Sequence, residues 1–156
     1  MYLHNLQIVL PDLKSYQTLI VTRWIQKHFL VQFLQENEIN PSEFVENYAI
    51  RLIANVISMI ENDFDDAQGL VTKEILHTFN DKDINQYDVF CLFQNLKNVC
   101  IELIEEGHIL SSNMLLNREA IIIDIYKVFE YITKEILRFY AQEYHQIIHN
   151  EEEQTA

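Results

Sequence analysis

Glycine and proline are scarce in this chain, with only two of each among 156 residues. Tight turns depend on these residues, so their scarcity favours a few long elements over many short strands. It also excludes the glycine-rich loops that bind nucleotide phosphates and the G-x-S-x-G turn of many hydrolases. The metal-binding H-E-x-x-H and redox C-x-x-C motifs do not occur either. We therefore expect a protein without enzymatic activity.

Cysteine is equally rare. Cys91 and Cys100 are nine residues apart on one predicted helix, and this spacing turns them to opposite faces. They cannot form a disulfide within that helix, so reduced and buried thiols are the expected state. The first ten residues contain neither a basic segment nor a long apolar core, and no signal peptide is predicted. Both observations favour a cytoplasmic protein.

Basic residues are outnumbered, with 11 Lys and Arg against 24 Asp and Glu and a net charge of −13. A nucleic-acid partner requires a surface rich in Lys and Arg, and so does adsorption to anionic membranes. No apolar run approaches the ~18 residues of a membrane span. We therefore expect neither nucleic acid nor a membrane as a partner. The 49% of apolar residues still indicates a folded globular domain.

Apolar residues recur at helical spacing along most of the chain. They predict five main helices, at about 13–35, 41–61, 66–79, 85–106 and 114–150. Asn40-Pro41-Ser42-Glu43 is a strong start signal for the second, with a capping residue before Pro at the first helical position. Gly107 is a suitable end for the fourth. The buried stripe of the first helix is predicted to contain Tyr16, Ile20, Trp24, Val31 and Leu34.

These elements predict an all-α fold, either globin-like or a five-helix bundle with a long C-terminal helix. Residues 1–11 are expected to form an N-terminal arm packed on the body of the protein. Residues 12–149 form the helical domain, and residues 150–156 form a frayed acidic tail.

The last predicted helix organises the rest of the chain. Its apolar arc is about twice the ~100° of an ordinary surface helix, which indicates that neighbours cover it from two directions. Asp124 and Lys127 belong to the opposite, charged arc. Glu143 then enters the middle of the apolar arc, so burial should end near this residue although nothing stops the helix.

The wide apolar arc divides into two stripes. The first is purely hydrocarbon and is predicted to face the domain's own core; it contains Ile121, Ile125, Val128, Ile132 and Phe139. The second mixes aromatic, aliphatic and hydroxyl groups, a composition typical of interfaces. We expect this second stripe to form the two-fold contact of a homodimer, through Ile122, Tyr126, Phe129, Thr133, Ile136 and Tyr140.

Histidines supply the remaining candidate residues. His28 follows Trp24 by one turn and flanks the buried stripe, which makes it the best candidate for a pH-sensitive position. His145 and His149 have a chelating i, i+4 spacing, but no E-x-x-H motif supplies further inward ligands, so neither a metal nor another cofactor is predicted. His77 and His108 are the residues that a haem iron would use. A haem- or metal-binding helical protein is therefore the first alternative function.

The pattern as a whole resembles one family. The resemblance lies in Val21-Thr22-Arg23-Trp24-Ile25, the long helix after Asn40-Pro41-Ser42-Glu43, the periodic segment 87–97 and the tyrosine-rich end at Tyr140 and Tyr144. These features are similar to the N-terminal sensor domain of the stressosome co-antagonist proteins, a haem-free relative of the globin fold. The resemblance spans about residues 13–146 and carries over no ligand-binding residue.

This resemblance implies a dimeric, non-catalytic sensor domain in stress-response signal transduction, whose last helix runs into an output domain. No output domain follows in this sequence, so we expect either a fragment of a longer protein or signalling through a partner protein. A second alternative function is a stand-alone acidic adaptor that binds a basic partner protein.

Overall fold

The computed structural model describes residues 3–64, 70–109 and 118–155, which are helical without any strand, so the all-α prediction is confirmed. A single π turn, η1, interrupts the series of α-helices. In order the elements are α1 (His4–Ile8), α2 (Leu10–Ser15), α3 (Gln17–Ile25), α4 (His28–Glu36), α5 (Pro41–Phe44), η1 (Val45–Ala49), α6 (Ile50–Glu61), α7 (Leu70–Asp81), α8 (Gln86–Glu105) and α9 (Arg118–Thr155).

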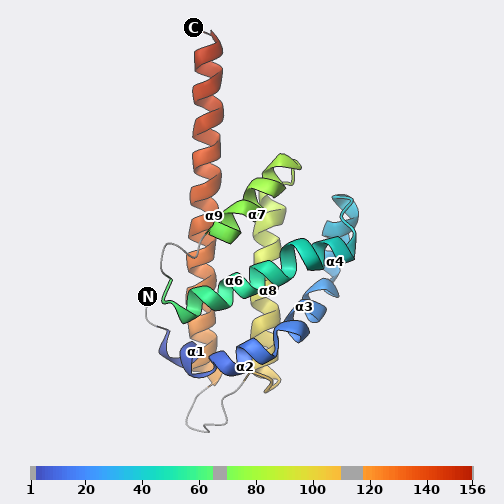
Figure 1. The fold of residues 1–156 in the computed structure, drawn as a ribbon, viewed down its shortest axis with the longest axis vertical. Helices are drawn as coiled ribbons and strands as arrows, with labels where there is room; N and C mark the ends of the chain where they lie inside the picture. Colours follow the sequence, from blue (N-terminus) through green and yellow to red (C-terminus); the bar gives the residue numbers. More distant parts are fainter. Residues whose placement is uncertain (1–2, 65–69, 110–117, 156) are drawn as a thin grey trace.

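The antiparallel helices α8 and α9 pack along each other as the central pair of the bundle. The other helices pack on one side of this pair (Figure 1). α6 crosses both of them, and α3 and α4 pack on α8. Trp24 lies fully buried in the core, with its ring edge-on to Phe44 at a centroid distance of 5.4 Å. The predicted burial of Trp24 is therefore confirmed.

The predicted helix at 13–35 is wrong in its continuity, because the chain forms three shorter helices there, α2, α3 and α4. Lys27 has an extended backbone, with ψ of 139°, which separates α3 from α4 and lets both pack on α8. Its ammonium group donates to Glu102 of α8 at 2.6 Å. The break changes the helical register, so Leu30 is buried while Val31, predicted to be buried, is 40% exposed.

The residues predicted to start and end helices do so in the structure, unlike the single continuous helix predicted at 13–35. Asn40 Oδ1 accepts the N–H of Ser42 at 2.8 Å, and Asn85 Oδ1 accepts the N–H of Tyr87 at 2.8 Å. Each asparagine therefore caps the helix that follows it, as expected. Gly107 has a φ of 85°, the left-handed conformation that ends α8. The predicted helix starts at Asp66 and Met114 lie outside the described residues.

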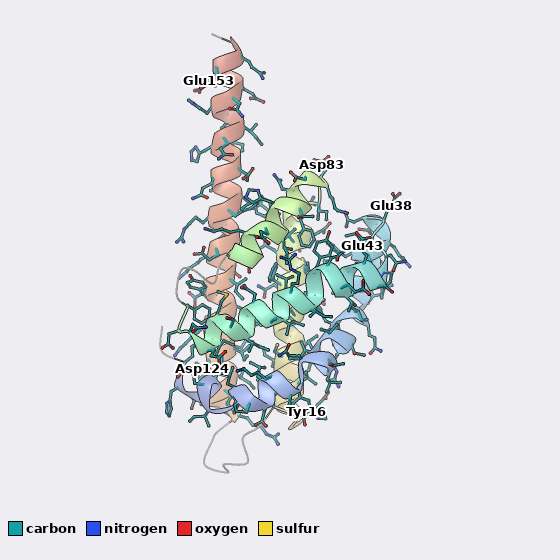
Figure 2. All side chains as sticks on the ribbon, in the orientation of Figure 1. Tyr16, Glu38, Glu43, Asp83, Asp124 and Glu153 are labelled. Atoms are coloured by element: carbon teal, nitrogen blue, oxygen red, sulfur yellow. The ribbon has the colours of Figure 1, made fainter. Side chains whose placement is uncertain are left out.

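The N-terminal arm predicted at residues 1–11 is itself helical, comprising α1 and the beginning of α2, and it is anchored by Asp124 of α9. Asp124 Oδ2 accepts the backbone N–H groups of Asn5 and Leu6 at 3.1 and 3.2 Å. These N–H groups belong to the first turn of α1, where no intrahelical acceptor exists. Figure 2 shows Asp124 beside the N-terminal helices.

The expectation that Asp124 lies on the exposed charged arc is therefore wrong, since only 3% of this residue is accessible. Lys127, one turn along, remains exposed, with its ammonium 3.9 Å from Asp124 Oδ1. Hydrogen bonds to the charged form offset the cost of removing a carboxylate from water. Asp124 thus acts as the N-terminal cap of a helix that lies more than a hundred residues earlier in the chain.

The terminal helix α9 contains 38 residues, which makes it about 57 Å long at ~1.5 Å per residue. Its last third extends beyond the bundle (Figure 1). Burial ends near Glu143 as predicted, since almost all side chains of residues 144–154 are exposed. The tail predicted to fray at 150–156 is instead helical through Thr155. Glu and Gln are good helix formers, and the segment contains no Gly or Pro.

Candidate functional site: an exposed seam along the terminal helix

Exposed large apolar side chains are concentrated on α9. Of the nine in the described part of the chain, five belong to this helix: Ile123, Tyr126, Leu137, Tyr144 and Ile147. They recur with alternating steps of three and four residues once Glu130, Thr133 and Tyr140 are included. This average step of about 3.5 residues keeps one line of side chains facing a partner helix. We call residues 123, 126, 130, 133, 137, 140, 144 and 147 the α9 seam.

The first predicted stripe of α9 is buried as expected, but the second stripe is only partly exposed. All members of the hydrocarbon stripe are buried, as predicted. In the stripe assigned to a partner, Tyr126 is exposed, and Ile122, Thr133 and Tyr140 are half-buried. Phe129 and Ile136 are 3% and 0% exposed, because they contribute to the chain's own core. Their assignment to an accessible surface is therefore corrected.

A groove of about 450 Å³ runs beside the seam, between α8 and α9. Its lining comes only from these two helices, on the side that α1 to α7 leave uncovered. Apolar, polar and charged side chains all line it. The lining residues are Gln94, Lys97, Tyr126, Phe129, Glu130, Thr133, Lys134 and Leu137.

Lys97 occupies the α8 side of this groove without a carboxylate partner among the described residues. Its ammonium donates to Gln94 Oε1 at 2.6 Å and lies 4.9 Å from the ring centroid of Tyr126. A cation above an aromatic face is attracted by the ring quadrupole. This contact holds both groups against the groove that they line.

Tyr140 lies further along the seam, next to the point where α9 leaves the bundle. Its hydroxyl is buried and has no hydrogen-bond partner among the described residues. Burial raises the pKa of this phenol above its ordinary value, since it disfavours the charged form. Its ring packs edge-on against Phe139 at a centroid distance of 5.1 Å.

α7 contacts α9 at the place where α9 leaves the bundle. The imidazole Nδ1 of His77 lies 3.7 Å from Glu143 Oε1, and its ring packs edge-on against Phe139 at 4.7 Å. A pocket of about 320 Å³ lies beside this contact, a size within the range of small-molecule sites. Both charged and apolar side chains line it: Met59, Thr72, Lys73, Leu76, Tyr131, Ile132, Glu135 and Arg138.

No family model, curated protein or solved structure matches this chain. The resemblance to the stressosome sensor domain therefore rests on the sequence pattern alone.

The histidine candidates do not converge on a site. His28 is exposed in the first turn of α4, because the break at Lys27 turns it away from the stripe of Trp24; its role as a pH-sensitive residue stays a prediction. His77 is exposed on α7, and His108 is half-buried against Tyr16 at a centroid distance of 5.7 Å. A void of only about 20 Å³ lies in the core, and neither of these two histidines lines it.

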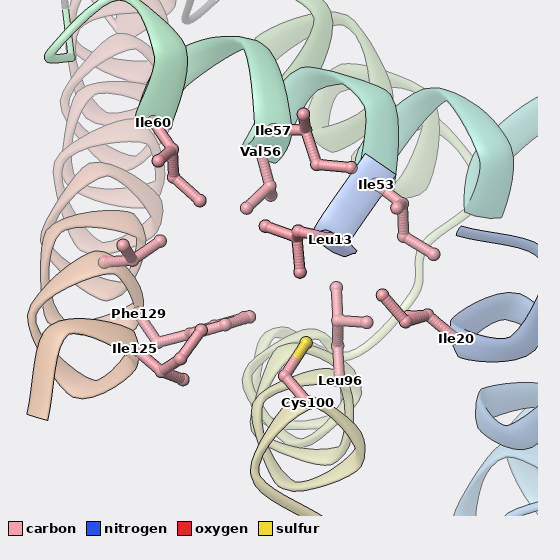
Figure 3. Close-up of a pocket in the computed structure, with 11 residues that line it drawn as sticks. Leu13, Ile20, Ile53, Val56, Ile57, Ile60, Leu96, Cys100, Ile125 and Phe129 are labelled. Atoms are coloured by element: carbon pink, nitrogen blue, oxygen red, sulfur yellow. The ribbon is translucent and has the colours of Figure 1, made fainter. Parts of the chain in front are cut away.

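This internal void is lined entirely by apolar side chains and the thiol of Cys100 (Figure 3). A void of this size holds at most about one water molecule and offers it no polar partner except the thiol. Its lining residues are Leu13, Ile20, Ile53, Val56, Ile57, Ile60, Leu96, Cys100, Ile125, Val128 and Phe129.

Within the described segments, no three His, Cys, Asp or Glu side chains come together in a way that would hold a metal ion. His149 lies beside Glu153 at 3.1 Å, and His145 is exposed one turn before it. In the same part of the chain, none of the helices has the length and apolar character needed to cross a bilayer.

The two thiols are expected to differ in reactivity at about pH 8. Burial raises the pKa of Cys100 from 9.0 to about 12, and only a thiolate reacts rapidly with a disulfide reagent. Cys91 is half-buried and accessible. One thiol per chain should therefore react in the native protein and both after denaturation, as measured by absorbance and located by peptide mass. Rapid native labelling of Cys100 would contradict its burial.

The same shift has a consequence for stability at alkaline pH. Above pH 9.0 the thiol of the unfolded chain ionises, whereas folded Cys100 keeps its proton until about pH 12. The unfolded state then binds fewer protons, so stability falls as the pH rises through this window. A Cys100→Ala variant should lose less urea resistance over this range than the wild type. Equal losses would show that Cys100 ionises alike in both states.

Proposed function

We propose that the protein is a non-catalytic cytoplasmic regulatory domain that forms a homodimer along α9 and passes a signal through this helix to an output domain or partner protein. The observation that carries the proposal is the α9 seam, which continues from the body of the bundle onto the extension. Apolar side chains exposed at a step of about 3.5 residues favour helix pairing. The resemblance to the stressosome sensor domains supports the same role in stress-response signalling.

The contact between α7 and α9 supports the signalling part of this proposal. α7 contacts α9 through His77, which lies beside Glu143, the residue directly before the seam residue Tyr144. α7 is also tied to α6 by a buried hydrogen bond of 2.8 Å from Asn55 to Thr72. A ligand in the pocket lined by Thr72, Lys73 and Arg138 would contact both α7 and α9. Such a ligand would shift α9 only by binding its two positions with different affinities.

The dimer surface is tested by charges at two exposed seam residues. Tyr126→Glu with Leu137→Glu is expected to give a folded monomer, because both side chains are about half exposed and a buried interface disfavours an unpaired carboxylate. These two replace Phe129 as targets, since a charge there would disrupt the core. Light scattering coupled to gel filtration measures the mass, and circular dichroism measures the helix content.

A matched control places the same two charges on exposed apolar residues of other helices. Val31→Glu with Ile50→Glu adds equal charge, at residues 40% and 48% exposed, and should remain dimeric. A wild type that is monomeric at tens of micromolar would refute the proposed dimer. A dimer that survives the Tyr126 and Leu137 changes would place the interface elsewhere.

A further inference from the structure

We propose that the α8/α9 groove of each protomer binds the acidic C-terminal extension of α9 from a second copy, in an antiparallel and reciprocal dimer. This inference rests on the proposed dimer function and specifies how the two chains meet. The extension is defined as residues 142–155, the part of α9 that lies beyond the bundle.

The extension carries four glutamates and no lysine or arginine. After Arg138 the sequence contains Glu143, three consecutive glutamates at residues 151–153, and no Lys or Arg. Two of its three large apolar side chains, Tyr144 and Ile147, are exposed in the single chain, and Ile148 is half-buried. A helix of this length gains little stability in isolation, so burying these side chains against a second surface would stabilise it.

The groove supplies charges of the opposite sign. Lys97 projects from α8 and forms no ion pair with any described residue. Lys134 projects from α9 and, among the residues that the structure describes, pairs only with its own neighbour Glu130, at 3.3 Å in an exposed i, i+4 pair. Such exposed pairs contribute little. Two lysines beside exposed apolar groups are unusual in a chain with a net charge of −13. Together they form a surface that would bind an acidic helix.

The orientation of the two chains follows from these charges. A parallel pairing of α9 would place each seam residue opposite its own copy, so Glu130 would meet Glu130 and the two acidic ends would lie side by side. Like charges in contact disfavour association by several kcal/mol. An antiparallel pairing instead places the acidic end of one chain over the half of the other chain's groove that carries Lys97, with Lys134 further along the same groove.

The spacing along α9 permits this arrangement. The groove is centred on the stretch from Tyr126 to Leu137, and the apolar part of the extension follows from Tyr144 onward. A two-fold axis near Tyr140 superimposes these two stretches. Tyr144 and Ile147 of one copy then fall over the Leu137 end of the groove of the other, and the acidic residues fall beyond them toward Lys97.

A charge-exchange experiment tests the arrangement. Lys97→Glu with Lys134→Glu, and separately Glu151→Lys with Glu152→Lys and Glu153→Lys, should each raise the dimer Kd tenfold or more. Equimolar mixing of the two variants should restore dimers, and so should all five changes in one chain, since acid and base again face each other. In a parallel dimer none of these single sets is expected to weaken association, because like charges remain opposite like charges. Sedimentation equilibrium provides the Kd.

Two controls separate this inference from the dimer itself. Lys14→Glu with Lys82→Glu reverses the same charge on exposed lysines of α2 and the α7–α8 loop and should leave the Kd unchanged. Truncation after Ala141 should leave a folded domain, by circular dichroism, that is monomeric. Unweakened charge variants or a dimeric truncation would overturn the inference while leaving the proposed dimer intact.

A distance measurement gives an independent decision. A spin label on Ile147→Cys, in a Cys91→Ser background that keeps the buried Cys100, reports the separation of the two extensions. The antiparallel arrangement places the labels more than about 20 Å apart along the helix axis, at ~1.5 Å per residue, and a parallel pair places them within about 20 Å. The short distance would overturn the antiparallel assignment. A monomeric wild type would overturn both it and the proposed function.

Discussion

Replacing Asp124 by alanine is expected to lower the free energy of unfolding by about 3 kcal/mol, because two hydrogen bonds to a charged acceptor are lost. The N–H groups of Asn5 and Leu6 would remain buried or half-buried without this acceptor. For a chain of this size, the loss corresponds to a decrease in melting temperature of roughly 10 °C. Urea unfolding followed by the fluorescence of Trp24, together with a thermal scan, measures both quantities.

Two variants serve as controls for this result. Asp124→Asn keeps an oxygen that can accept these N–H groups and should lose clearly less stability than alanine. Glu130→Ala removes an exposed carboxylate of the same helix and should change stability by less than about 0.5 kcal/mol. If Asp124→Ala were as mild as Glu130→Ala, the anchoring of the N-terminal arm would contribute nothing to the fold.

A second large effect is expected from a pair of isoleucines only two residues apart. Ile125 is 2% exposed and lines the internal void, whereas Ile123 is 54% exposed on the seam. Ile125→Glu should cost about 4 kcal/mol or more, a large share of the ~5–15 kcal/mol that keeps a typical domain folded. We expect an unfolded or aggregated chain, detected by circular dichroism and light scattering.

Ile123→Glu carries the same chemical change two residues away in sequence and about 200° away around the helix. It should leave the melting temperature of the single chain nearly unchanged and should weaken association only. Equal loss of helix in both variants would show that Ile123 is also part of the folded core. Ile123 would then no longer belong to the α9 seam.

Local sequence signals predicted the elements of this fold well. The Asn40 and Asn85 caps and the stop at Gly107 depend on backbone groups within a few residues, so their chemistry can be read directly from the sequence. The break at Lys27 has no such signal, because it depends on the packing of α3 and α4 against α8. The misplaced burial of Val31 follows from that break.

The candidate site was predicted only in part, for a related reason. The width of the apolar arc on α9 indicated two covered faces but did not say how far the first neighbour, α8, reaches around the helix. Phe129 and Ile136 are buried in the chain's own core, whereas Tyr126 and Leu137 stay exposed. Asp124 escaped prediction because its partners, Asn5 and Leu6, are more than a hundred residues away. Its position among four isoleucines was the one local hint.

The projection of α9 beyond its contact with His77 makes the helix a lever. Glu143 is the fulcrum, and Thr155 lies twelve residues further along, which is about 18 Å at ~1.5 Å per residue. A tilt of only about 10° at the fulcrum would displace the tip by roughly 3 Å, given this arm length and a rigid helix. Side-chain shifts at the α7 contact too small to disturb the core would thus be magnified where the extension ends.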